Sequence, residues 1–98
     1  MNVRFSDKRL ERLELDADYR AGFGLNVVKL FRLRMALVRA AKDERAFYAL
    51  KSLHYEKLKG ARSHQRSMRL DKQFRLVLEV EQIADGRQVV VISVEDYH

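Results

Sequence analysis

The sequence contains no cysteine and no proline, and no apolar run approaches the roughly 18 residues that a membrane span requires. The absence of cysteine excludes disulfides, thiolate nucleophiles and zinc sites built on cysteine, and it suits a reducing compartment. The N-terminal stretch MNVRFSDKRLERL is charged from its fourth residue and lacks the apolar centre of a signal peptide. We therefore expect a soluble, cytoplasmic protein.

The 98 residues are enough for one modest core, so we expect a single domain over residues 1–98. A hydrophobic fraction of 47% favours a packed globule over disorder. The net charge of +6 is unevenly distributed: residues 51–75 contain eight Lys or Arg against two Asp or Glu, whereas residues 76–98 contain one against five. Such a basic concentration indicates either a polyanionic partner or a basic surface that faces solvent.

The first half of the chain begins as a short strand followed by a short helix. Residues 1–5 predict the strand, and Ser6 suits the N-cap of the helix, with Asp7 in its first turn. Residues 7–15 place leucines on one side of this helix among charged residues. Two glycines in residues 16–24 then interrupt the pattern and indicate a linking turn.

Residues 25–42 predict the clearest helix, because apolar side chains recur there at steps of three and four. The apolar arc of this helix is very wide, so the helix must be covered on more than one side. It either packs between a sheet and another helix or docks a partner protein with part of its surface. Residues 43–53 predict a third short helix, with Asp43 as a possible cap.

The last third of the chain alternates between apolar and polar residues, as strands do. Residues 64–70, 74–82 and 87–94 predict three strands, and Asp85-Gly86 is a hairpin turn signal between the last two. The order of strand, helices and three-strand meander predicts an α+β fold. We expect a small antiparallel sheet packed against two to three helices.

Local motifs for a metal or a bound nucleotide are absent from the sequence. His54, His64 and His98 lie ten or more positions apart and have no cysteine to help them, so we expect no metal and no cofactor. The chain also lacks a phosphate-binding glycine loop and a nucleophile elbow. A histidine at a chain end is by itself more often frayed than functional.

Two arginines in the predicted meander suggest a phosphate site. If the connection between their strands is tight, Arg69 and Arg75 point to the same face of the sheet. Two guanidiniums on one face form a clamp for phosphate, because their forked donors match its oxygens. The alternative is that each arginine is an independent strand residue facing solvent.

Three sequence elements between residues 55 and 98 stand in a recognisable order: YEKLKGAR, then SMRLDKQFR, then DYH at the chain end. Together they resemble the HigB-type killer toxins of bacterial toxin–antitoxin systems, within the RelE/ParE superfamily. The positions that match are Leu58, Lys59, Gly60, Arg62, Ser67, Arg69, Gln73, Arg75, Asp96, Tyr97 and His98. Ala61, Asp71 and Phe74 depart from the family, which usually has Asp, Asn and Trp at these places.

The resemblance implies a RelE-like fold and a type II toxin that cuts mRNA on the ribosome. Metal-free RNA cleavage needs an activated 2′-hydroxyl, a protonated 5′-oxygen and compensation of the charge on the phosphorane. The catalytic residues implied are His98, Tyr97, Arg75, Arg69 and Asp96. The residues expected to bind RNA are Lys57, Lys59, Arg62, Arg66, Lys72 and His54.

The charges near the chain end bear on the role of His98. The terminal carboxylate and Asp96 favour the imidazolium form, so His98 is better suited to donate a proton than to accept one. Two alternatives remain open, a ParE-like toxin that poisons DNA gyrase and a non-catalytic module that binds RNA or a partner. The expected partners are mRNA on the ribosome and a HigA-like helix-turn-helix antitoxin, through which alone operator DNA is bound; no membrane is expected.

Overall fold

The computed structural model describes residues 1–97, in which three α-helices and two short 3₁₀ helices accompany a five-stranded sheet. In chain order the elements are β1 (Asn2–Phe5), α1 (Lys8–Leu15), α2 (Leu25–Ala40), α3 (Arg45–Ala49), η1 (Lys51–Leu53), β2 (Glu56–Lys57), η2 (Gly60–Arg62), β3 (Arg66–Arg69), β4 (Phe74–Ile83) and β5 (Gly86–Asp96). Within residues 1–97 no helix is long and apolar enough to cross a membrane.

The sheet has the strand order β1-β5-β4-β3-β2 and is mixed. Strands β2 to β5 pair antiparallel, as expected for a meander, but β1 runs parallel to β5. The expectation of a wholly antiparallel sheet is therefore corrected, because the helices between β1 and the meander return the chain so that β5 runs in the direction of β1. The α+β class is confirmed.

The long β4–β5 hairpin forms the centre of the sheet, and the predicted turn joins its strands. Gly86 adopts a φ of +123° at the start of β5, a conformation that favours glycine. The register shifts by one residue between Val77 and Leu78, which marks a β-bulge. Because of this bulge, Ser93 and Glu95 point to the side of the sheet away from Val89 and Val91.

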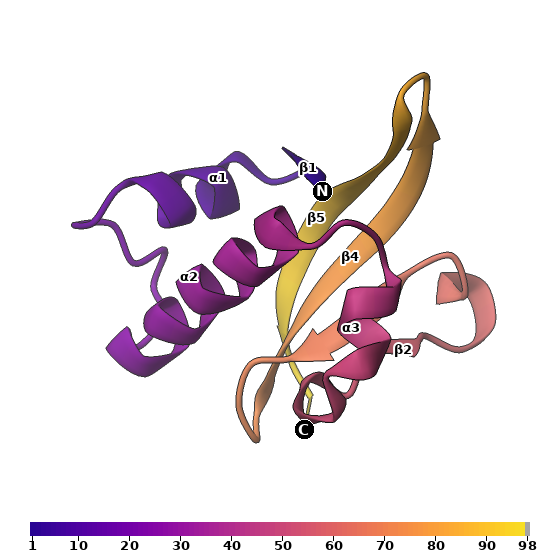
Figure 1. Cartoon of the computed structure of the whole chain (residues 1–98). Coiled ribbons are helices and arrows are strands. Elements are labelled where there is room, and N and C mark those ends of the chain that lie inside the picture. Colours follow the sequence, from indigo (N-terminus) through magenta and orange to yellow (C-terminus); the bar gives the residue numbers. More distant parts are fainter. Residues whose placement is uncertain (98) are drawn as a thin grey trace.

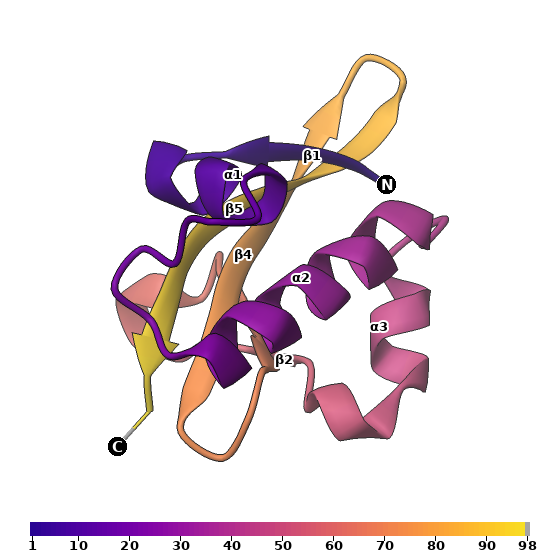
Figure 2. The ribbon, with the colours of Figure 1, turned by 90° about the vertical axis from the view of Figure 1, so that its left-hand side faces the viewer.

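Helix α2 lies across one face of the sheet (Figure 1). In Figure 2, α2 and α3 lie on one side of β4 and β5, and α1 lies beside β1. The core fills the space between α2 and the sheet, and its fully buried side chains include Val28, Phe31, Met35, Val38, Leu76, Leu78, Val89 and Val91. The prediction that α2 contacts both a sheet and another helix is confirmed, whereas Leu33 on its outer side remains 62% exposed.

The residues at the starts of α1 and α3 differ from the predicted caps. The Asp7 carboxylate, not Ser6, caps α1 by accepting a hydrogen bond from the Arg9 backbone N–H at 2.8 Å. Ser6 instead donates through its hydroxyl to the Val91 carbonyl at 3.2 Å, so it ties β1 to β5. Asp43 accepts from the Arg45 N–H at 2.9 Å but lies one residue before the N-cap position of α3, which is Glu44, and α3 is shorter than predicted.

Candidate functional site

The face of the sheet opposite α2, which we call the open face, presents the predicted arginine pair. Arg69 and Arg75 are direct cross-strand partners in the β3–β4 register, so both side chains leave the same face. The connection between the strands is tight, with the Leu70 N–H donating to the Phe74 carbonyl at 2.9 Å. Met68 and Leu76, the adjacent residues, point the other way and are fully buried.

Arg75 is held from three directions. Its Nη1 donates to Glu56 Oε1 at 2.7 Å and to the hydroxyl of the fully buried Ser67 at 3.1 Å. Its Cζ lies 4.0 Å from the ring centroid of Tyr97, which is a cation–π distance. The Arg75 side chain is only 17% exposed, so the guanidinium is fixed in position before any ligand arrives.

The end of β5 is tied to the β3–β4 turn. The Tyr97 N–H donates to the Gln73 carbonyl at 2.7 Å, and Gln73 Nε2 donates to Asp96 Oδ2 at 2.8 Å. Asp71 stabilises the turn itself by accepting from the N–H groups of Gln73 and Phe74. The chain is thus anchored through Tyr97, while His98 lies outside the described residues.

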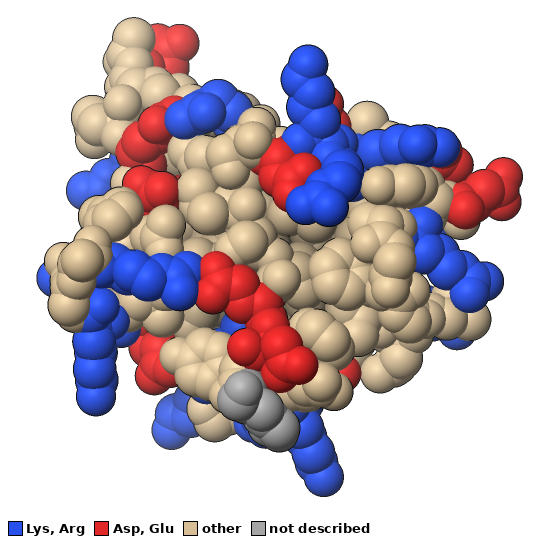
Figure 3. Space-filling view, turned by 180° about the vertical axis from the view of Figure 1, so that it is seen from behind, with Lys and Arg blue, Asp and Glu red and all other residues tan. Residues whose placement is uncertain are grey.

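A groove of about 380 Å³ opens beside Tyr97 and is lined by Leu58, Lys59, Arg62, Glu95, Asp96 and Tyr97. A neighbouring hollow of about 350 Å³ continues along Glu56 to Lys59 and shares Tyr97. Figure 3 shows this side of the molecule, with acidic side chains in its lower middle and a basic side chain reaching them from the left. The Tyr97 ring, with Arg75 against it and 48% of the residue exposed, offers a surface on which a nucleobase can stack.

Arg62 spans the groove and pairs with Glu95 on β5. Its Nη1 and Nη2 donate to the two carboxylate oxygens of Glu95 at 2.9 and 2.6 Å, a bidentate contact. The Ser93 hydroxyl donates to the same carboxylate at 2.6 Å. The hydrogen bonds from Arg62 lower the pKa of Glu95, so this carboxylate stays charged at neutral pH.

Arg69 contacts His54 at the edge of the open face. Arg69 Nη1 lies 3.2 Å from His54 Nε2, and Arg69 Nε donates to the Asp71 carbonyl at 3.1 Å. A guanidinium only donates, so the first contact is favourable when His54 Nε2 carries no proton. His54 has a left-handed φ of +47°, which is uncommon for histidine and marks a constrained position.

The segment that carries His54 and Glu56 is anchored by the residue between them. Tyr55 is buried, its hydroxyl donates to Glu44 Oε2 at 2.7 Å, and its ring contacts Phe47 edge-on. Burial, followed by the Glu44 carboxylate, raises the pKa of Tyr55 well above its usual value. Tyr55 therefore fixes His54 and Glu56 without taking part in the open face itself.

The remaining predicted RNA-binding residues are scattered. Lys59 is exposed and lines both hollows beside Tyr97, Lys57 is exposed and lines only the smaller of them, and Lys72 is exposed in the β3–β4 turn. Arg66 shares the helix-covered side of β3 with Met68; its Nε lies 3.6 Å from Glu44, and it donates to the Ser63 carbonyl. In the β2–β3 register Lys57 pairs with Arg66, so its side chain leaves the same side of the sheet as Arg66. The open face and its edges therefore bring together the other predicted basic residues, but not Arg66 and Lys57.

Glu56 and Glu95 were missed by the sequence analysis, which named Ser67 only as a position that matches the family and not as a site residue. Each is brought there by strand register, since Glu56 pairs with Ser67 and Glu95 lies across from Arg75. Given Arg75 as a site residue, Glu95 could be inferred only from the alternation of side chains along β5. That inference also requires knowledge of the β-bulge, which changes the face to which Glu95 points. Within residues 1–97, no three His, Asp or Glu side chains gather as metal ligands do.

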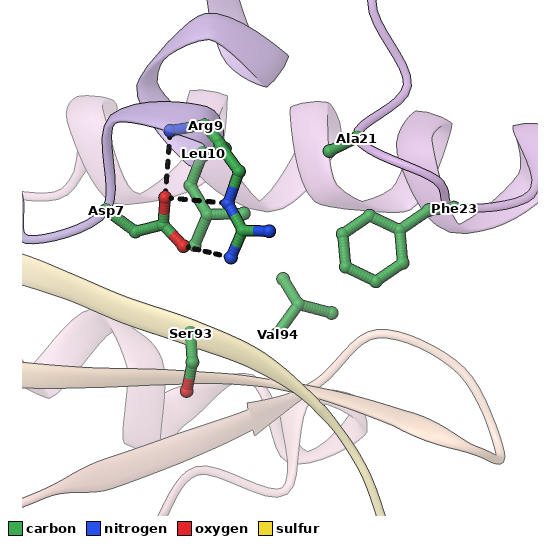
Figure 4. Close-up of a pocket in the computed structure, with 7 residues that line it drawn as sticks. All are labelled: Asp7, Arg9, Leu10, Ala21, Phe23, Ser93 and Val94. Atoms are coloured by element: carbon green, nitrogen blue, oxygen red, sulfur yellow. Dashed lines mark hydrogen bonds and ion pairs between the residues drawn. The ribbon is translucent and has the colours of Figure 1, made fainter.

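A separate, smaller cavity of about 90 Å³ lies between α1 and β5 (Figure 4). Its charged residues, Asp7 and Arg9, bond to each other at the start of α1, and Leu10, Phe23 and Val94 supply apolar walls. The Ser93 side chain points away from Asp7 and Arg9 in Figure 4. A space that holds a few waters and whose charges are already paired serves the packing of α1 rather than ligand binding.

The three helices and mixed five-stranded sheet define the class of fold found in RelE- and YoeB-like toxins. The YoeB/ParE toxin from Agrobacterium tumefaciens superposes with a TM-score of 0.57 and 16% identity over 100% of both chains. YafQ from Escherichia coli strain BL21(DE3) gives a TM-score of 0.57 and 10% identity over 98% of this chain and 92% of its own. The YoeB dimer from Staphylococcus aureus gives a TM-score of 0.51 and 18% identity over 100% of this chain and 97% of its own.

At the level of sequence, no family model and no curated protein matches the chain. The likeness to these solved structures lies in the fold, and it extends over the whole chain.

Proposed function

We propose that the protein is a toxin of a type II toxin–antitoxin system and cuts mRNA on the ribosome, most closely in the manner of HigB-type toxins. The observation that carries this proposal is the fixed guanidinium of Arg75, set between Glu56, Ser67 and Tyr97 on the open face. The fold shared with a YoeB/ParE toxin supports the class. The three motifs between residues 55 and 98 support the HigB type.

The chemistry proceeds as an attack of the 2′-oxygen on the adjacent phosphorus. The 2′-oxygen loses its proton and bonds to phosphorus, the bond to the 5′-oxygen breaks, and that oxygen gains a proton. Arg75 compensates the charge on the phosphorane, because its donors are already oriented in a largely buried site. Glu56, whose side chain is 53% exposed beside Arg75, is placed to accept the 2′-hydroxyl proton, and His98 donates to the leaving oxygen.

The other groups bind and orient the RNA. Tyr97 stacks on a base, with Arg75 against its ring, and Asp96 fixes the end of β5 through Gln73. Arg69 holds a neighbouring phosphate. The exposed cations that attract the RNA backbone are Lys59, Lys72 and, once the RNA displaces Glu95, Arg62. His54 contributes through its contact with Arg69, and Lys57 is left out because it pairs with Arg66 in the β2–β3 register. Arg66 is left out, because Glu44 holds it on the other side of the sheet.

The proposed partners are mRNA within the ribosome and a HigA-like helix-turn-helix antitoxin in the cytoplasm. Operator DNA would be bound through the antitoxin. A ParE-like gyrase poison is kept as the second candidate, because the fold is shared with the YoeB/ParE toxin from Agrobacterium tumefaciens.

Expression in bacteria tests the proposal. We expect growth arrest with the unchanged chain and with Arg4→Ala, a control at the far end of the open face. Arg75→Ala and His98→Gln should relieve the arrest, and primer extension on cellular mRNA should show breaks only in arrested cells. Arrest with intact mRNA and relaxed DNA would replace this proposal with the gyrase candidate. Arrest that survives both substitutions would remove the site.

A further inference from the structure

The cation of the groove that best matches a phosphate is already occupied by a carboxylate of the same chain. The two terminal nitrogens of Arg62 face the two oxygens of Glu95, at 2.9 and 2.6 Å. This is the fork geometry that a guanidinium offers to a phosphate as well. Glu95 thus stands where an RNA phosphate would bind Arg62.

Glu95 is held in that place by its strand and by a neighbour. Glu95 lies directly across from Arg75 in the β4–β5 register and contacts Arg62, so its charge lies between Arg62 and Arg75. The Ser93 hydroxyl, two residues earlier on the same strand, donates to its Oε2 at 2.6 Å. The side chains of Arg62 and Glu95 are 47% and 33% exposed, so solvent screens the pair and a ligand can reach it.

We propose that Glu95 is a specificity-determining residue that stands in for an RNA phosphate on Arg62, so that the groove rejects free single-stranded RNA. This inference rests on the proposed function and adds a reason for ribosome dependence. An RNA strand free in solution must displace Glu95 while it also loses its own freedom. An RNA strand that the ribosome already holds has lost this freedom beforehand. Its phosphate can therefore replace the Glu95 carboxylate on Arg62 without a further ordering cost.

The molecule contains a matched pair for comparison. Arg4 and Glu81 form a similar bidentate contact on the open face, at 3.3 and 3.1 Å, between β1 and β4. Glu81 pairs with Gln88 near the opposite end of the hairpin, far from Tyr97 in register. Glu95→Gln and Glu81→Gln therefore remove the same charge from the same sheet, one inside the groove and one outside it.

The test is a binding titration with the full chain and a fluorescein-labelled, 2′-O-methyl single-stranded RNA that cannot be cut. Removal of one negative charge about 4 Å from a phosphate should strengthen binding about fivefold for Glu95→Gln. We expect less than about a twofold change for Glu81→Gln, which lies beyond the screening length from the groove. Circular dichroism establishes that both variants are folded.

A double variant separates the pair from the general charge of the protein. Adding Arg62→Ala to Glu95→Gln should abolish the gain, because the freed cation is then missing. Equal gains for Glu95→Gln and Glu81→Gln, no gain for Glu95→Gln, or a gain that survives the loss of Arg62 would each overturn the inference. Because the probe is not cut, these results do not depend on catalysis, whereas the primer-extension result decides the proposed function by itself.

Discussion

The two faces of the sheet differ in this protein: one packs against α2 in the core, and the other carries the candidate site. Leu76 and Arg75 are neighbours on β4, yet Leu76 is fully buried under α2 while Arg75 contacts Glu56, Ser67 and Tyr97 on the open face. The alternation of a strand places a core residue and a functional residue at successive positions. Stability and the proposed RNA cleavage should therefore be separable by substitutions one residue apart.

The largest expected effect on stability comes from the core side. Leu76→Ala removes a fully buried side chain and should lower the free energy of unfolding by about 2–5 kcal/mol. Urea denaturation followed by circular dichroism measures this loss. A cost below about 1 kcal/mol would show that the α2 side does not carry the core.

Tyr55→Phe tests the residue that connects the two faces. Loss of the hydrogen bond to Glu44 should cost about 1.5–3 kcal/mol, since the bond is made to a charged group. Cleavage should change little if His54 and Glu56 keep their places. Urea denaturation and ribosome-bound mRNA cleavage, measured on the same preparation, check both statements, and a large loss of cleavage would show that the hydroxyl orients the site directly.

The same variant carries a pH signature. The raised pKa of Tyr55 means that the folded state prefers the protonated phenol, whereas an unfolded tyrosine ionises near pH 10. The stability due to this hydroxyl is complete below about pH 10 and is lost as the pH rises further. The difference in the free energy of unfolding between the unchanged chain and Tyr55→Phe should thus be constant up to about pH 10 and shrink above it, and a difference that stays constant to about pH 11 would contradict the assignment.

Gln73→Ala has the smallest expected effect on stability and tests how the end of β5 is anchored. The side chain is exposed, so stability should stay within about 0.5 kcal/mol. Cleavage should fall about three- to tenfold, because a loosened Asp96-Tyr97 segment misplaces the reacting groups. Gln82→Ala, exposed at the far end of β4, is the control. Equal cleavage by both variants would make Gln73 a surface residue only.

Local patterns predicted what depends on local geometry. The strand–helices–meander order and the common face of Arg69 and Arg75 follow from alternation, and both are present. The hairpin predicted from Asp85-Gly86 is present as well, with Ala84 and Asp85 as its two turn residues and Gly86 as the first residue of β5. The N-cap of α1 was wrong by one residue, because Ser6 finds a partner on β5 that the local sequence does not show.

Contacts between distant segments were beyond the sequence. The parallel direction of β1 depends on which edge of the meander it joins, and nothing in Asn2–Phe5 encodes that edge. The two-residue strand β2 is too short to show alternation, so Glu56 could not be placed against Arg75. Glu95 required both the β4–β5 register and its bulge. These are the residues that turn a predicted arginine clamp into a site with paired charges.

The most direct test of the open face as an RNA-cleaving site is the single-turnover rate of mRNA cleavage on purified ribosomes. The unchanged chain is compared with Arg75→Ala and with Arg4→Ala, which removes an arginine of the same face outside the groove. We predict a loss of about 10²–10³-fold for Arg75→Ala, the size expected when a preorganised donor to the transition state is removed, and an unchanged rate for Arg4→Ala. Equal rates for the two variants would contradict the account.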